Sequence, residues 1–272
     1  MPSKSIAEEE LQFLAITKTS EMWKSVSSAI MTIVDEAYFE AGPKGIAFRS
    51  MDPSHIALID ISWPNTAFEK YECASTIKFG LKISDFAKII KRTNPDDLVE
   101  VYLKESSLNI KTTGNYIRNY KMNLLVSGDE KSSPLPKLTF DSKMVIGTSL
   151  LDKIMTDIQV LVDNMTIETI AGKSAVTFSG TTDNGNATVM VDHKSGTTEV
   201  VEENLLLLQE VTVEQNSKSA YNIDYISKIV KALASSCETI TLEYSSKKPL
   251  RLEFILLNAL KVQFFLAPRI DN

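Results

Sequence analysis

Histidine and cysteine, the side chains that most often carry nucleophilic, acid–base or metal chemistry, are scarce in this chain. Its 272 residues include two histidines, His55 and His193, and two cysteines, Cys73 and Cys237. No HxxxH, HExxH or CxxC spacing is present, so no metal-ligand motif is formed. A catalytic histidine also needs an oriented partner, and the sequence singles none out. We therefore expect no catalytic residue, no metal site and no cofactor, and the separated cysteines favour a reducing compartment.

Two short segments carry part of a ligand-binding motif but lack the rest. Residues 171–174, Ala-Gly-Lys-Ser, end like a phosphate-binding loop, yet Ile167 stands where that loop needs its first glycine. The residues that follow favour a strand, whereas the loop requires a helix. Residues 182–186 suggest a calcium loop but lack its later acidic ligand, and their Asn-Gly pair is typical of a hairpin turn. The sequence therefore predicts that the chain is not an enzyme.

The overall charge argues against a surface that binds nucleic acid or acidic lipid everywhere. Acidic side chains outnumber basic ones 35 to 29, which gives a net charge of −6, and such binding needs an excess of lysine and arginine. A local basic patch stays compatible with this balance. No apolar run approaches the roughly 18 residues that span a membrane. We expect neither a membrane segment nor a secretory signal.

Alternation of apolar and polar residues, the period of strands with one buried face, dominates the chain. Near the C-terminus it runs through residues 240–244, 250–256 and 260–266, and in the first half through residues 99–103, 108–110 and 120–124. Turn-forming residues separate these runs. Closely spaced strands of this kind predict antiparallel meanders.

Helical periodicity is confined to four short segments, residues 20–36, 84–93, 148–160 and 222–234. Ser84 and Asn222 stand where N-cap residues are expected. Four small helices among many strands predict an α+β protein.

The order of these elements repeats along the chain. Residues 83–91 of the first half parallel residues 223–231 of the second. A stretch rich in Ser, Pro, Gly and charge lies between the halves and is typical of a surface connector. We predict two similar domains, residues 12–126 and 139–272, each an antiparallel sheet with two helices, joined by a connector at residues 127–138.

Lysines recur at comparable places on the predicted helices. Lys88 and Lys91 are three residues apart, as are Lys228 and Lys231, so each pair projects from one face opposite the apolar stripe. One interpretation is an ordinary solvated helix face, since the same helices also carry acidic residues. The other is a surface that touches phosphates without reading bases.

Three separate motifs resemble the proliferating cell nuclear antigen family of DNA sliding clamps. Residues 45–58 contain its Met-Asp-x-Ser-His element, residues 266–270 its Leu-Ala-Pro-Lys/Arg signature, and residues 218–221, Lys-Ser-Ala-Tyr, are similar to archaeal members. The likeness covers about residues 13–270 in order. It implies the DNA clamp fold and a trimeric ring, closed head to tail around duplex DNA.

The resemblance also implies which residues meet DNA and neighbouring subunits. Edge strands at residues 116–123 and 187–191 would pair between subunits, which would cover their exposed backbone groups. The interface residues implied are Tyr116, Tyr120, Met122, Ile158, Ala187 and Val189. The DNA-facing residues implied, on the helices that line the hole, are Lys24, Lys88, Lys91, Arg92, Lys153, Lys228 and Lys231.

A pocket for partner peptides is implied beneath the connector. In the family it receives a short peptide with a Gln, an aliphatic residue and a pair of aromatics, and exposed apolar residues of this kind mark interaction sites. The matching positions are Met51, His55, Leu58, Leu135, Leu138, Phe140, Pro249, Phe264, Phe265, Ala267 and Pro268. For each of them, plain core packing is the alternative interpretation.

The function implied is that of a processivity factor in DNA replication and repair. A clamp loader would open the ring, and the ring would tether DNA polymerase, flap endonuclease and DNA ligase through their peptide motifs. The alternative is a checkpoint-type clamp subunit that forms a heterotrimer with two relatives in the DNA-damage response. A β-rich enzyme acting on carbohydrates or phosphates is disfavoured because the sequence offers no site. An archaeal clamp would act in the cytoplasm at the nucleoid, a eukaryotic one in the nucleus.

Overall fold

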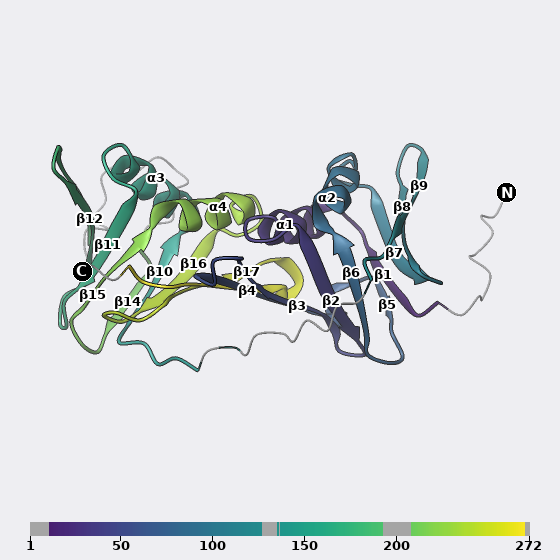
Figure 1. Ribbon diagram of the computed structural model, residues 1–272, viewed down its shortest axis with the longest axis horizontal. Coiled ribbons are helices and arrows are strands. Elements are labelled where there is room, and N and C mark those ends of the chain that lie inside the picture. Colours follow the sequence, from purple (N-terminus) through teal and green to yellow (C-terminus); the bar gives the residue numbers. More distant parts are fainter. Residues whose placement is uncertain (1–10, 127–134, 136, 193–207, 270–272) are drawn as a thin grey trace. The chain divides into compact units, whose positions relative to one another are not determined.

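The computed structural model describes residues 11–126, 135, 137–192 and 208–269 (Figure 1). Its contacts divide the chain into two units, each of which combines segments that are distant in sequence. The first unit comprises Met1–Ser50, Ile61–Ser132 and Leu257–Leu260, and the second Met51–Asp60, Ser133–Leu256 and Lys261–Asn272. Among the described residues, no helix is long and apolar enough to cross a membrane.

The first unit contains a five-stranded antiparallel sheet, a second group of strands and two helices. The five-stranded sheet has the order β5-β1-β7-β8-β9, and in the second group β2 lies between β6 and β3, with β4 beyond β3. The helices α1 and α2 lie side by side (Figure 1). The bounds are β1 (Phe13–Thr17), α1 (Glu21–Ile30), β2 (Glu36–Gly42), β3 (Gly45–Met51), β4 (Ala57–Pro64), η1 (Asn65–Ala67), β5 (Lys70–Glu72), β6 (Ile77–Lys82), α2 (Ile83–Lys91), β7 (Leu98–Lys104), β8 (Ser107–Thr113), β9 (Ile117–Asn123) and η3 (Leu257–Ala259).

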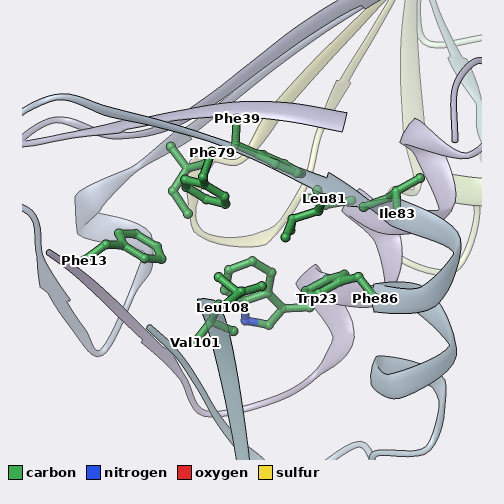
Figure 2. A pocket seen from close by; sticks show the side chains of 11 residues that line it. Phe13, Trp23, Phe39, Phe79, Leu81, Ile83, Phe86, Val101 and Leu108 are labelled. Carbon is green, nitrogen blue, oxygen red and sulfur yellow. The ribbon is translucent and has the colours of Figure 1, made fainter. Parts of the chain in front are cut away.

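Aromatic side chains fill the core of the first unit. The ring of Trp23 on α1 lies 4.5 Å from that of Trp63 and 5.8 Å from that of Phe86 on α2, measured between centroids. Figure 2 shows Trp23 and Phe86 facing Phe39 and Phe79 of the strands. The cavity that these side chains line has a volume of about 20 Å³. The lining is apolar throughout, and a space of this size and character stays dry. The cavity is therefore a small packing void, not a ligand site.

The second unit repeats this design. One sheet has the order β14-β10-β16-β17-β18, with the first half of β4 beside β18, and a four-stranded sheet has the order β13-β12-β11-β15. The helices α3 and α4 pack together. The bounds are β10 (Ser142–Gly147), α3 (Thr148–Gln159), β11 (Asn164–Thr169), β12 (Ala175–Thr182), β13 (Gly185–Asp192), β14 (Glu210–Val213), β15 (Ser217–Asn222), α4 (Ile223–Leu233), β16 (Thr239–Tyr244), β17 (Leu250–Ile255) and β18 (Lys261–Leu266).

The predicted internal repeat is confirmed in element order and in pairing. Each half runs, in its described residues, as one strand, a helix, five strands, a second helix and three strands. The first strand pairs with the strand after the second helix in both halves, β1 with β7 and β10 with β16. The second strand likewise pairs with the sixth, β2 with β6 and β11 with β15. The α+β class and the antiparallel meanders are confirmed as well.

Two details of the predicted helices are wrong. The first helix ends at Ile30, not near residue 36, because Thr32 turns its hydroxyl and its amide back onto the carbonyl of Ala29 at 2.6 and 3.1 Å. Ser84 is not an N-cap, since α2 begins at Ile83 and the carboxylate of Asp35 accepts the Ser84 amide instead. The Asn222 cap of α4 is confirmed, because its side chain accepts the amide of Tyr225.

Candidate functional site

Among the described strands that end a sheet, β9 and β13 are the two that the resemblance places at the subunit interface. β9 ends the five-stranded sheet of the first unit, and β13 ends the four-stranded sheet of the second. Large apolar side chains are exposed beside both edges: Tyr116 (62%) next to β9, and Met190 (69%) on β13. An open edge with exposed apolar residues favours pairing with another chain.

The interface residues that the resemblance implied are only partly at the surface. Tyr120 and Met122 on β9, and Ala187 and Val189 on β13, are half-buried. Ile158 on α3 is fully buried in the core of the second unit, which argues against a direct contact with a neighbouring subunit. Its neighbour Val160, at the C-terminal end of α3, presents an exposed apolar side chain (78%). The apolar periodicity of a helix in the sequence does not show which apolar residue just past the end of the helix stays exposed to solvent.

Arg118 ties β9 to the end of α2. Its guanidinium donates to the carbonyl of Arg92 at 3.0 Å and to the carboxylate of Asp97 at 3.2 Å, and it lies 4.3 Å from the ring centroid of Tyr116. Burial would raise the pKa of Asp97, but hydrogen bonds from Asn94 and the charge of Arg118 lower it below its usual range. A side chain at Gly114 would collide with the Asp97 carboxylate, so the turn before β9 needs glycine there.

Basic side chains are exposed on three of the helices. Lys91 lies at the end of α2, Lys153 on α3 and Lys228 on α4. Lys88 forms an exposed ion pair with Asp85 at 2.8 Å, and Lys231 lies 4.0 Å from Asp152 of α3. Arg92 is exposed at the C-cap of α2. These side chains are available to phosphates, with the charge of Lys88 partly offset by its neighbour.

Lys24 is engaged inside the first unit. Its ammonium group donates to the carbonyl of Thr93 at 2.9 Å, just beyond the last turn of α2. A cation here satisfies a carbonyl that has no partner within the helix and complements the helix dipole. The DNA-facing role expected of Lys24 is therefore not what its geometry favours, and sequence spacing alone could not reveal the bond to Thr93.

The residues expected in the partner pocket all belong to the second unit, and some of them lie on the sheet that contains β17 and β18. Phe265 on β18 lies opposite Arg251 on β17, and Leu58 lies on the neighbouring strand β4. Both apolar side chains are buried, Leu58 with 6% of its surface exposed. The other residues expected in the pocket, half-buried except for the exposed His55, are Met51, His55, Leu135, Leu138, Phe140, Pro249, Ala267 and Pro268.

Phe264 is not part of this surface. It lies opposite Leu252 in the pairing of β18 with β17 and points to the other face of the sheet, where it is buried in the core. This position argues against a role in the pocket, because successive residues of a strand point to opposite faces and Phe265 occupies the other one. The sequence could not decide between Phe264 and Phe265, since β18 is covered on both faces.

The segment after the connector is fixed to the outer face of the same sheet. The guanidinium of Arg251 lies 5.1 Å from the ring centroid of Phe140 and also binds the carboxylate of Glu243. Lys248 donates from its ammonium group to the carbonyl of Thr139 at 3.0 Å. Arg251 and Lys248 were not singled out in the sequence, and they hold one wall of the surface in place. Of the connector itself, residues 127–134 and 136 lie outside the described residues.

The turn between β3 and β4 is organised by the buried carboxylate of Asp52. One of its oxygens accepts the amides of Ile56 and Ala57 at 2.8 and 2.7 Å. The other accepts the amide of Ser54 and the phenol of Tyr225 on α4, both at 3.1 Å. The carbonyl of Ile56 in turn accepts the amide of Ala267 at 2.8 Å. The Met-Asp-x-Ser-His motif thus builds a turn that also braces the C-terminal segment.

These bonds set the ionisation of the two side chains. Burial would raise the pKa of Asp52, but the hydrogen bonds from the three amides and from Tyr225 lower it below its usual range. Burial, followed by the charge of Asp52, raises the pKa of Tyr225. Asp52 therefore stays an acceptor and Tyr225 a donor at neutral pH. In the described part of the chain, no three His, Cys, Asp or Glu side chains form a group that could hold a metal ion.

Two matching halves, each with a helix pair backed by antiparallel sheets, define the class of protein as one with the DNA clamp fold. The chain belongs to the proliferating cell nuclear antigen family: the model of that family's N-terminal domain matches residues 13–126, and the model of its C-terminal domain matches residues 134–269.

Relatives and solved structures agree with this membership. The DNA polymerase sliding clamp of Nitrosopumilus maritimus is 42% identical over 96% of this chain and all of its own length, and that of Cenarchaeum symbiosum is 39% identical over the same shares. The crystal structure of the Thermococcus kodakaraensis antigen has a TM-score of 0.85 at 21% identity, over 94% of this chain and 100% of its own. That from Entamoeba histolytica has a TM-score of 0.84 at 22% identity, over 96% of this chain and 100% of its own.

Proposed function

We propose that this chain is a DNA sliding clamp, a ring that encircles duplex DNA and tethers a DNA polymerase to it. The observation that carries the proposal is the full-length identity of 42% to an archaeal relative named a DNA polymerase sliding clamp. The checkpoint-type clamp subunit is the weaker alternative, because the archaeal relatives that match at full length are named as polymerase clamps. We place the protein in the cytoplasm of an archaeal cell, at the nucleoid.

The ring would be a trimer closed by β9 of one subunit and β13 of the next. Both strands are open sheet edges bordered by exposed apolar side chains, which supports their pairing. Two different edges joined head to tail give a heterologous interface, and such an interface closes into a ring when the rotation allows it. We also propose that the first domain ends at residue 126 and that the second begins at residue 139, with the connector between them.

DNA would be held by enclosure and by weak phosphate contacts. Lys91, Arg92, Lys153 and Lys228 are exposed on or beside helices, and lysine and arginine bind phosphates without reading sequence. The net charge of −6 discourages binding elsewhere on the surface. Few and exchangeable contacts suit a protein that slides, because retention comes from the closed ring.

Partner enzymes would bind the outer-face surface around Leu58 and Phe265. We propose that it takes a short peptide with a Gln, an aliphatic residue and a pair of aromatics, carried by DNA polymerase, flap endonuclease or DNA ligase. A clamp loader would open the ring. The expected residues combine buried and half-buried apolar side chains, which supports a docking site.

The experiment that tests the proposal compares closed and linear DNA. The purified protein is loaded with an archaeal clamp loader and ATP onto a nicked circle, and half of the sample is then cut once with a restriction enzyme. We expect the protein to stay on the circle and to leave the linear DNA by its free ends. Equal retention on both forms would contradict enclosure, and light scattering should give about three times the chain mass of 30.2 kDa.

A further inference from the structure

The β3–β4 turn makes three hydrogen bonds within itself and one to a distant element through the same carboxylate. The amides of Ser54, Ile56 and Ala57 all come from the turn that Asp52 begins. The phenol of Tyr225 comes from α4, which is 173 residues away in the chain. Amides that close a turn onto its own Asp determine the shape of that turn. The bond from Tyr225, in contrast, fixes the position of the turn relative to α4.

The tie to α4 matters because α4 lies against the strand that carries the other wall of the proposed pocket. α4 contacts β18, which bears Phe265 and leads into Ala267 and Pro268. The turn bears the first wall, with Met51 at its start and the exposed His55 at its tip. His55 has a φ of 58°, and its amide donates to the carbonyl of Asp52 at 2.9 Å. The amide of Ala267, bonded to the carbonyl of Ile56 at 2.8 Å, already joins the two walls at one point, and the bond from Tyr225 to Asp52 adds a second tie.

We propose that Tyr225 is a positioning residue of the partner pocket, whose hydroxyl group holds the Met51–His55 wall in register with the Phe265–Pro268 wall through Asp52. The inference rests on the proposed function, because it concerns the affinity of the same pocket for a peptide. It adds a residue on a helix that was otherwise assigned only to DNA contact.

A peptide that touches both walls gains affinity when their spacing is already set. If the turn can pivot, binding must first restrict that motion, which weakens the complex. The local bonds of Asp52 would still keep the shape of the turn when the hydroxyl is removed. We therefore expect Tyr225→Phe to weaken peptide binding about three- to tenfold, mainly through faster dissociation, with the turn itself intact.

Tyr71→Phe is the matched control. The Tyr71 hydroxyl donates to the carbonyl of Gly42 at 2.8 Å, and the residue is half-buried in the first unit, outside the pocket. Both variants lose the phenol hydroxyl group with its hydrogen bonds and keep the ring. A general loss of stability would affect them alike, whereas lost positioning would affect the pocket of Tyr225→Phe alone.

The test titrates the full-length protein with a fluorescent synthetic peptide that contains a Gln, an aliphatic residue and two adjacent aromatics. Hydrogen exchange of the Ile56 and Ala57 amides is measured on the same samples. Support requires weaker binding by Tyr225→Phe with protection of both amides retained, and unchanged binding by Tyr71→Phe. Asp52→Asn should lose both affinity and protection, and adding Tyr225→Phe to it should have little further effect.

Two results would overturn the inference, and they differ in what they say of the pocket. If the wild-type protein binds the peptide and Tyr225→Phe binds it equally well, Tyr225 has no positioning role while the pocket assignment stands. If the wild-type protein does not bind the peptide at all, the pocket assignment fails and the role of Tyr225 fails with it.

Discussion

At the scale of single residues, a substitution of Lys24 distinguishes a structural role of this lysine from a role in DNA contact. Its bond to the carbonyl of Thr93 predicts that Lys24→Met lowers the free energy of unfolding by about 1 kcal/mol, because a charged donor at a helix end is lost. The time for which the protein is retained on linear DNA, before it leaves by the free ends, should stay close to wild type. Urea denaturation and the retention assay measure the two quantities.

Lys228→Met is the comparison that makes the Lys24 result informative. Lys228 is exposed on α4, so its loss should change the free energy of unfolding by less than about 0.5 kcal/mol. It should also shorten retention on linear DNA, because weak phosphate contacts slow the escape of the ring by the free ends. The opposite pattern, with Lys24→Met weakening retention at unchanged stability, would return Lys24 to the DNA-facing group.

The ionisation of Asp52 predicts a dependence of stability on pH. Its pKa is lowered in the folded protein, so the folded state favours the carboxylate, and the stabilisation is complete above the unfolded-state pKa of about 3.9. It is lost as the pH falls through the folded pKa. Asp52→Asn should cost about 1–3 kcal/mol at pH 7, and this difference from wild type should shrink below pH 4. Urea denaturation at pH 7 and pH 3 checks it, and a difference that grows at low pH would contradict the assignment.

At the scale of elements, a buried chain of hydroxyl groups joins the two sheets of the second unit. The Thr169 hydroxyl on β11 lies 2.7 Å from that of Ser142 on β10 and 2.8 Å from that of Tyr244 on β16. Thr169→Val keeps the shape and removes the middle link, so two buried hydroxyls lose a partner. We expect a loss of about 1–3 kcal/mol in the free energy of unfolding. Thr212→Val on β14, an exposed position, should change it by less than about 0.5 kcal/mol.

The sequence predicted elements well where one face of an element is exposed, and poorly where the environment comes from distant segments. The alternation of apolar and polar residues predicted that Ile240, Leu242 and Tyr244 face inward, because the outer face of β16 is more exposed to solvent. All three side chains are buried. The same rule could not place Phe264, since β18 is buried on both faces. The hydrogen bond of Lys24 could not be predicted for a related reason, since its partner Thr93 is 69 residues away in the sequence.

At the scale of the whole molecule, the central proposal is that one subunit uses two different edges. Each edge has two exposed apolar side chains that can be changed without disturbing the core. They are Tyr116 and Ile117 for the β9 edge, and Val160 and Met190 for the β13 edge. Replacing either pair with Asp would place like charges in an apolar contact and disfavour that edge alone.

A head-to-tail ring makes a specific prediction for mixtures of these two variants. The chain with Tyr116→Asp and Ile117→Asp keeps its β13 edge, and the chain with Val160→Asp and Met190→Asp keeps its β9 edge. Each variant alone lacks one half of every interface and should have the mass of a monomer. Mixed together, they can form one intact interface but no second one, so the expected product is a heterodimer of about twice 30.2 kDa that is not retained on circular DNA. Light scattering after size-exclusion chromatography measures these masses. A trimer from either variant alone would show that the altered edge does not form the interface, and a mixture that stays monomeric would show that β9 and β13 do not pair with each other.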